Sequence, residues 1–210
     1  MMPVDFSLLA QQCAPAVAPT TLQALVKTES GFNPYAIGVV GGHLARQPAT
    51  RNEALATARA LEAAGRNYSM GLAQVNRANL RALGLTSESV FDPCANLRAG
   101  GVLLADCYKR ASGARLGPQD AMRAALSCYY SGNFTRGFMP DQHGTSYVQR
   151  VAANAADLPA SAVVVPPIAV VPDRVAPASG PVHVRRAPRP EDAQASLQNH
   201  HPAWDALGDF

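Results

Sequence analysis

KTESGFNPYAIG, residues 27–38, is where a predicted helix ends with a glutamate and the chain breaks into Gly, Asn and Pro. Glu29 follows Leu25 by four positions and Val26 by three, so it falls on the apolar face of that helix. Gly31 predicts the helix end, which places Glu29 in the last turn, where the helix dipole disfavours negative charge. Burial and the dipole both raise the pKa of a carboxyl group. The stretch therefore predicts either an acid protonated near neutral pH or, as the ordinary alternative, a glutamate that reaches solvent.

On either side of this stretch, residues typical of helix caps and helix ends predict further helices. No segment shows the sustained alternation of apolar and polar residues that is typical of a β-strand. Pro, Asn or Asp opens these segments, and Gly closes several of them. The predicted helices cover residues 21–30, 53–65, 94–111 and 119–132, and Asn52 is the expected N-cap of the second. We expect a small all-α domain over residues 1–157, with at most a short β-ribbon between residues 36 and 48.

The composition changes sharply near residue 157. Nine of the 17 prolines lie from Pro159 onward. Residues 158–210 therefore predict a disordered, Pro-rich tail. The tail closes with WDALGDF, residues 204–210, whose apolar side chains recur every three residues and are typical of a short docking peptide. A disordered end with chance aromatic residues is the alternative.

Charge and hydropathy exclude some classes of protein. The net charge of +3 suits an anionic polymer but falls far short of a nucleic-acid-binding signature. The chain has no apolar run near 18 residues, so no membrane span is predicted. Its N-terminus does not predict a signal peptide, because no basic residue precedes Lys27 and Asp5 interrupts a short apolar stretch.

Four cysteines predict two disulfides and an oxidising compartment, with free thiols in the cytosol as the alternative. Their spacing does not predict a metal site. Cys94 and Cys107 lie on one predicted helix, roughly 20 Å apart, so they cannot pair with each other. Two pairings remain, Cys13–Cys94 with Cys107–Cys128 or Cys13–Cys107 with Cys94–Cys128. We prefer the first, because Cys107 and Cys128 lie on adjacent helices joined by a short loop.

Two further stretches carry groups that bind sugars. YSMGLAQVNRANL, residues 68–80, places side-chain amides just after a glycine, where they can bond sugar hydroxyls and N-acetyl groups. AALSCYYSGNF, residues 124–134, places two tyrosines and an asparagine at a helix end. Either stretch alone also fits a polar loop or core aromatics. The candidate substrate-binding residues are Gln74, Asn76, Tyr129, Tyr130 and Asn133.

The sequence offers no strong second carboxylate beside Glu29. Most glycosidases use two carboxyl groups that flank the scissile bond, although substrate-assisted enzymes are exceptions. Glu53 and Glu62 lie on an Ala-rich helix and predict a solvated face, and Asp92 is better explained as a helix N-cap. A mechanism with one carboxyl group fits this scarcity.

Taken in order, the motifs resemble a known family. ES followed by NP.AIG, then GLAQVN, ALSCYYSGN and SYVQRV, resembles the lytic transglycosylases with the goose-type lysozyme-like (SLT-type) fold. QQCAPAVAP, ESGFNPYAIGVV, FDPCANL and the terminal WDALGDF resemble the VirB-type branch, which is associated with type IV secretion systems. The resemblance covers residues 8–153 well and the tail in character and at its end.

The resemblance implies roles for individual residues. Glu29 matches the catalytic glutamate, and Ser30, which follows it as in the family motif, is a further candidate for substrate binding. Gln74 matches a glutamine that contacts the substrate, and Tyr129 matches a tyrosine of the family's AYNAG stretch. Tyr130 stands where that stretch has Asn, which puts any role of that Asn in doubt. The extra segment that includes the residue 52–65 helix is either a lid over the cleft or a spacer.

The resemblance also implies a reaction and a place. The expected activity is cleavage of the MurNAc-β-1,4-GlcNAc bond of peptidoglycan with formation of 1,6-anhydro-MurNAc, without a metal or an organic cofactor. The expected location is the periplasm, where the enzyme would open the cell wall for type IV secretion assembly. The expected partners are glycan strands and, through the tail, secretion channel subunits. The alternatives are a muramidase of the same fold that uses water and a non-catalytic glycan-binding assembly factor.

Overall fold

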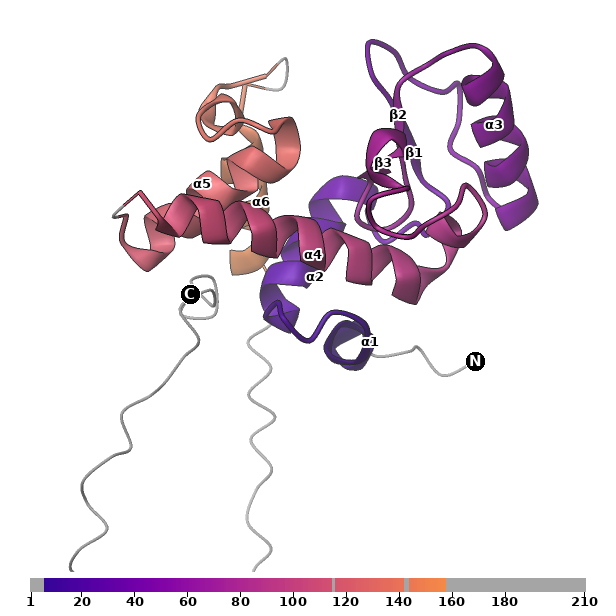
Figure 1. Ribbon diagram of the computed structural model, residues 1–210. Helices are drawn as coiled ribbons and strands as arrows, with labels where there is room; N and C mark the ends of the chain where they lie inside the picture. Colours follow the sequence, from indigo (N-terminus) through magenta and orange to yellow (C-terminus); the bar gives the residue numbers. More distant parts are fainter. Residues whose placement is uncertain (1–5, 115, 142–143, 158–210) are drawn as a thin grey trace, which may run out of the picture. The chain divides into compact units, whose positions relative to one another are not determined.

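The computed structural model describes residues 6–114, 116–141 and 144–157, which are mostly helical with a small sheet (Figure 1). The predicted tail, residues 158–210, and its terminal docking peptide lie outside the described residues. The helices are α1 (Phe6–Cys13), α2 (Pro19–Ser30), α3 (Arg51–Ala63), α4 (Pro93–Ser112), α5 (Pro118–Ser131) and α6 (Tyr147–Ala156). The strands are β1 (Ile37–Val39), β2 (Tyr68–Met70) and β3 (Val75–Asn76), and the 3-10 turns are η1 (Arg77–Asn79), η2 (Ser89–Phe91) and η3 (Arg136–Phe138). No helix in the described ranges is long and apolar enough to cross a membrane.

The predicted helix ends are largely confirmed. α2 begins with Pro19 and ends at Gly31, which takes the left-handed conformation with φ 58°. Asp92 caps α4 by accepting a hydrogen bond of 2.8 Å from the backbone N–H of Ala95. α5 ends at Gly132, with φ 71°. These ends matter because α2 and α5 both terminate at the site described below.

The predicted start of α3 is wrong by two residues. Thr50, rather than Asn52, is the N-cap, and its side chain accepts a hydrogen bond of 3.2 Å from the N–H of Glu53. Asn52 lies inside the first turn and is exposed. A hydroxyl three residues before a glutamate is itself a helix-start signal, so the sequence did contain the correct cap.

The small β-structure expected beside the helices is confirmed, but its predicted bounds, residues 36–48, contain only one of its strands. β1 is the only part of that segment that forms a described strand, and it pairs antiparallel with β2, which in turn pairs with β3. The other edge of β1 is bonded by the side-chain amide of Gln47, which accepts from the N–H of Ile37 at 2.8 Å and donates to its carbonyl at 3.0 Å. Gln47 thereby takes the place of a neighbouring strand at an edge that would otherwise be unpaired.

Two large buried clusters, with a third small one formed by three alanines, hold the described part of the chain together. Figure 1 shows the sheet and α3 towards one end of the long helix α4, and α5 and α6 towards its other end. The helical cluster packs α1, α2, α4, α5 and α6 around residues such as Leu22, Leu25 and Leu126. The second cluster lies beneath the sheet and includes Tyr68 and Met70, both fully buried. The site lies between the sheet and the end of α5.

Two disulfides reinforce the helical cluster. Cys13 of α1 is bonded to Cys94 of α4, with 5.1 Å between their Cα atoms. Cys107 of α4 is bonded to Cys128 of α5, with a Cα separation of 5.8 Å. This is the pairing preferred from the sequence, and no described cysteine is free.

Candidate active site

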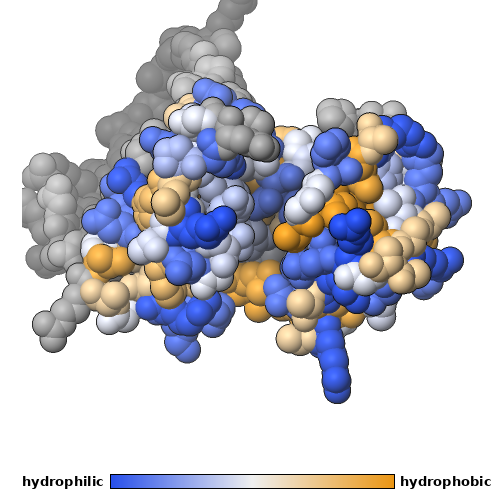
Figure 2. Space-filling model, turned by 90° about the horizontal axis from the view of Figure 1, so that it is seen from above, coloured by the Kyte–Doolittle hydropathy of each residue, from blue (hydrophilic) through white to orange (hydrophobic). Residues whose placement is uncertain are grey.

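A cavity of about 770 Å³ separates the sheet from the end of α5. Figure 2, which looks down on the molecule from above, shows the surface hollowed into a groove between these two sides. Glu29 lines it from the last turn of α2. Residues from β1 and the following loop form one wall, and residues 129–132 with Arg136 form the other. The acid singled out from the sequence therefore lies at the cavity rather than in the closed core.

Burial decides the protonation of Glu29. Desolvation raises the pKa of its carboxyl group from 4.5 to about 7. A hydrogen bond from Tyr147 and the positive charge of Arg150 act in the opposite direction, but they are smaller effects. The carboxyl group is therefore poised near neutral pH, and it can donate a proton in one step and accept one in the next.

Tyr147 is a site residue that the sequence analysis did not assign. It is the first residue of α6, is 4% exposed, and donates its hydroxyl hydrogen bond to Oε1 of Glu29. Burial and the neighbouring Glu29 raise the pKa of Tyr147 well above its usual value, so the phenol remains a donor. Ser146 and Gln149 form a capping box that fixes the start of α6. That sequence signal predicts a helix start at Tyr147 but not its contact with Glu29.

Tyr130 covers Tyr147 from the cavity side. Their rings are stacked with centroids 4.6 Å apart and planes 16° apart. Tyr130 lines the cavity and is 46% exposed, whereas Tyr147 is buried beneath it. The exposed ring can therefore present an aromatic surface to a sugar while it holds the Tyr147–Glu29 hydrogen bond away from water.

Tyr129 does not bond Glu29. Its hydroxyl donates to the backbone carbonyl of Ala73, with an O–O distance of 2.5 Å. Burial, and secondarily the charge of Glu29, raise the pKa of Tyr129 well above its usual value. Tyr129 lines the cavity and ties the end of α5 to the loop that carries Gln74.

Asn96, a buried side chain of α4, fixes the same loop from the other side. Its Oδ1 accepts from the N–H of Ala73 at 2.7 Å, and its Nδ2 donates to the carbonyls of Met70 and Val90 at 2.9 and 2.8 Å. Gly71 has φ 80°, and a Cβ there would lie 2.2 Å from Nδ2 of Asn96. A side chain at position 71 would therefore displace Asn96. The sequence analysis missed Asn96, whose only signal is a polar residue within an apolar helix.

Gln74 points its amide oxygen into the cavity wall. Its Nε2 donates to the carbonyls of Gly71 and Ala36, at 2.9 and 3.1 Å. These bonds fix the amide, and they leave Oε1 close to Gly38, where a Cβ would lie only 2.7 Å away. Gln74 holds φ 48°, a conformation that costs free energy for a residue other than glycine. The fixed Oε1 can accept a hydrogen bond from a hydroxyl or an amide of a ligand.

The remaining candidates are placed differently. Asn76 lines the cavity, and its side chain bonds Asn67 and Ser69 and caps η1. Ser30 and Asn133 do not line the cavity. The hydroxyl of Ser30 donates back to the carbonyl of Val26 at 3.2 Å. The amide oxygen of Asn133 accepts three hydrogen bonds within its own loop. Both side chains are used locally.

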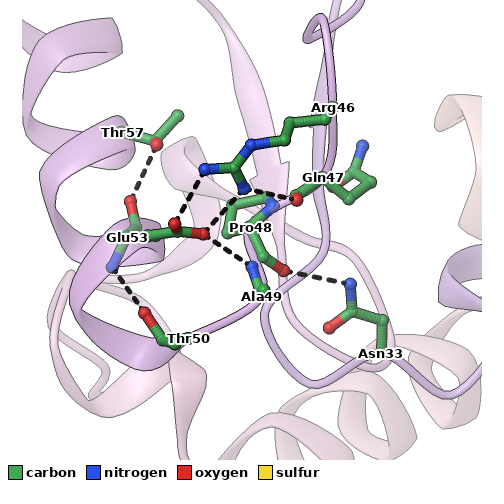
Figure 3. A network of polar contacts seen from close by, with 8 residues as sticks. All are labelled: Asn33, Arg46, Gln47, Pro48, Ala49, Thr50, Glu53 and Thr57. Atoms are coloured by element: carbon green, nitrogen blue, oxygen red, sulfur yellow. Dashed lines mark hydrogen bonds and ion pairs between the residues drawn. The ribbon is translucent and has the colours of Figure 1, made fainter.

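A clamped loop forms the wall next to β1. Figure 3 shows Arg46 and Glu53 joined by two hydrogen bonds of 2.8 and 2.7 Å, with Glu53 also accepting from the N–H of Ala49 at 2.8 Å. These bonds lower the pKa of Glu53 to about 2, with the Arg46 side chain the largest cause, so the pair stays ionised. Asn33 donates to the carbonyl of Pro48 at 3.4 Å and joins the loop to the end of α2. No residue of α3 lines the cavity, so α3 anchors this wall from behind.

Comparison with known proteins identifies the family. Residues 7–146 match the model of the transglycosylase SLT domain. The chain belongs to the SLT-domain transglycosylases. It is 52% identical over 205 residues to the type IV secretion system protein virB1 of Brucella abortus, covering 97% of this chain and 85% of that protein. It is 35% identical over 181 residues to protein virB1 of Agrobacterium fabrum, covering 83% of this chain and 67% of that protein. No solved structure matches.

In this SLT-domain transglycosylase, Glu29 is the one carboxylate among the described residues that line the cavity. Glu53 is bound by Arg46, and Glu62 forms hydrogen bonds with Tyr68 and Arg77. The described residues also contain no group of three His, Cys, Asp or Glu side chains that could hold a metal ion. Glu29 is therefore the candidate acid that this SLT-domain site presents to its cavity.

Proposed function

We propose that the protein is a peptidoglycan lytic transglycosylase that cleaves the β-1,4 bond between N-acetylmuramic acid and N-acetylglucosamine. The observation that carries the proposal is Glu29, a carboxyl group with a pKa raised to about 7, placed at an open cavity with no second carboxylate lining it among the described residues. The membership of the SLT-domain transglycosylases supports it. The cavity has a volume of about 770 Å³, and amide side chains such as Gln47, Gln74 and Asn76 line it, which suits the binding of sugar rings.

The proposed reaction uses Glu29 twice. The protonated carboxyl group donates its proton to the glycosidic oxygen, and the C–O bond breaks as positive charge develops at the anomeric carbon. The N-acetyl group of the substrate stabilises this charge. Glu29, now ionised, accepts the proton of the muramoyl 6-hydroxyl, whose oxygen closes on the anomeric carbon. The product is 1,6-anhydro-MurNAc, no water is consumed, and Glu29 ends protonated as it began.

Neighbouring groups support both states of Glu29. Tyr147 donates to Oε1 and stabilises the carboxylate formed after the first proton transfer. Burial favours the protonated state that starts the cycle. Gln74 offers a fixed amide oxygen on the opposite wall, where it can orient an N-acetyl N–H or a hydroxyl. The two walls thus hold the sugar across the acid.

Substitution of the acid tests the proposal. Glu29→Gln keeps the shape of the side chain and removes its proton, so release of soluble fragments from purified peptidoglycan should fall at least about a hundredfold. Glu88→Gln is the matched control, because Glu88 is exposed and paired with Arg59 away from the cavity. Undiminished release by Glu29→Gln would disprove catalysis by Glu29.

A role in secretion is the second part of the proposal. The Brucella abortus relative, named as a type IV secretion system protein, supports a periplasmic enzyme that opens the wall locally for assembly of the channel. We propose that the tail, residues 158–210, recruits channel subunits through its terminal WDALGDF. A chain truncated after residue 159 should keep its turnover on purified glycan and lose partner recruitment. Loss of turnover would instead mean that the tail belongs to the catalytic fold.

Two alternatives make different predictions. A muramidase would use the same acid but let water attack the anomeric carbon, so its product would be heavier by one water molecule. A non-catalytic assembly factor would retain both wall cleavage in cells and secretion after Glu29→Gln. The buried, hydrogen-bonded acid favours a catalytic role over the second alternative.

A further inference from the structure

Arg136 stands apart from the other arginines near the site. It begins η3, is exposed, and lines the cavity on the α5 side. Elsewhere, Arg46, Arg77 and Arg150 are each paired with an acidic side chain. The guanidinium of Arg136 takes part in no ion pair or side-chain hydrogen bond within the described ranges. A permanent positive charge therefore faces the cavity without an internal partner.

The backbone that carries Arg136 is firmly held. The amide oxygen of Asn133 accepts from the N–H of Thr135 at 2.8 Å and from the N–H of Arg136 at 3.1 Å. On the other side, the fully buried hydroxyl of Ser127 accepts from the N–H of Gly137 at 2.8 Å. A Cβ on Gly137 would lie 2.6 Å from the Cα of Ser127, so this contact needs glycine. Asn133, which the sequence analysis predicted to bind substrate, thus also fixes the backbone of Arg136.

The α5 side of the cavity carries a positive charge that no acidic side chain among the described lining residues on that side balances. Apart from Tyr129 and Tyr130, the ionisable residues that line the cavity in the described part of the chain are Glu29, His43 and Arg136. Glu29 is largely uncharged when it acts as the acid, because burial raises its pKa to about 7. The electrostatic potential on the α5 side of the cavity is then determined mainly by the positive charge of Arg136. A guanidinium presents a planar fork of N–H donors that matches a carboxylate.

We propose that Arg136 binds a carboxylate carried on the 3-O-lactyl group of muramic acid, and so makes the site selective for muramoyl glycans over neutral ones. This rests on the proposed function, since it assumes a peptidoglycan strand in the cavity. Two sources share the chemistry. In an intact strand the carboxylates belong to the peptide attached to the lactyl group, and in a strand stripped of peptides the lactyl carboxylate itself is free.

Binding rather than turnover tests this assignment. The full chain with Glu29→Gln is titrated with three glycans of equal length, namely peptide-bearing strands, amidase-stripped strands and uncharged N-acetylglucosamine oligomers. Adding Arg136→Gln should weaken binding of one or both carboxylate-bearing strands about five- to tenfold and leave the neutral oligomer unchanged. The loss should shrink at high salt, because the contact is partly exposed to solvent. Which of the two charged strands loses affinity identifies the source of the carboxylate.

Arg123→Gln provides the matched control, since Arg123 is an exposed arginine of α5 that does not line the cavity. It should leave all three affinities unchanged. Equal weakening of the neutral and charged strands by Arg136→Gln, or no weakening at all, would overturn the proposal. Either result would leave the proposed reaction untouched, because that reaction is judged separately by the cleavage products of the unmodified protein.

Discussion

The raised pKa of Glu29 has a consequence for folding that can be measured without a substrate. The folded state holds this proton more tightly than the unfolded chain, because the pKa rises from 4.5 to about 7 on burial. Glu29 therefore does not lower the free energy of unfolding below pH 4.5, but it lowers it progressively as the pH rises from 4.5 towards 7. The difference between the two values corresponds to about 3 kcal/mol. Since Glu29 borders an open cavity, we expect about 2–3 kcal/mol in practice.

Glu29→Gln removes this penalty without removing the shape of the side chain or its ability to accept from Tyr147. Urea unfolding of both proteins, with disulfides intact, gives the stability difference at each pH, and other titrating groups cancel in the comparison. Between pH 4.5 and pH 8, the free energy of unfolding of the variant should increase by about 2–3 kcal/mol relative to that of the unmodified protein. Glu88→Gln should show no comparable gain. A difference for Glu29→Gln that stays constant over this range would refute the buried, neutral acid.

Other substitutions probe the groups around the acid. Tyr147→Phe removes a donor that stabilises ionised Glu29, so the pKa rises further and the limb of the pH–rate profile set by Glu29 should move to higher pH; an unmoved limb would contradict this. Asn96→Ala leaves three buried backbone groups without a partner and should cost about 3–5 kcal/mol in urea unfolding, with weaker glycan binding by Gln74. Glu53→Gln weakens the bonds that hold the cavity wall to Arg46 and Ala49. KM should therefore rise roughly severalfold with kcat unchanged, and amide hydrogen exchange in residues 40–50 should become faster. An unchanged exchange rate would show that the wall does not depend on this pair.

The acid itself could be predicted from the sequence, because local geometry determines its position. The spacing from Leu25 and Val26, together with Gly31, places Glu29 on the apolar face of the last turn. The structure adds that desolvation is the largest cause of the raised pKa. The helix ends at Gly31, Gly132 and Asp92 were predictable for the same reason, because a helix cap depends on residues no more than about four positions apart in the sequence.

Long-range contacts could not be predicted in this way. Tyr147 reaches Glu29 across 118 positions, and nothing local to either residue indicates that they meet. The partner of β1 is likewise β2, on the far side of α3, so the predicted bounds 36–48 contained only one strand of the sheet. Asn133 shows a second limit. Its residue type suits sugar binding, and the sequence does not show that three hydrogen bonds within its own loop occupy the amide oxygen.

The ends of the released glycan test the central claim most directly. Peptidoglycan digested by the unmodified protein is separated and weighed by mass spectrometry, with Glu29→Gln as the inactive control. The single-acid mechanism predicts muramoyl ends in the 1,6-anhydro form, lighter by one water than hydrolysed ends, and none from Glu29→Gln. Reducing ends as the main product would contradict ring closure by the 6-hydroxyl and show that water reaches the anomeric carbon instead.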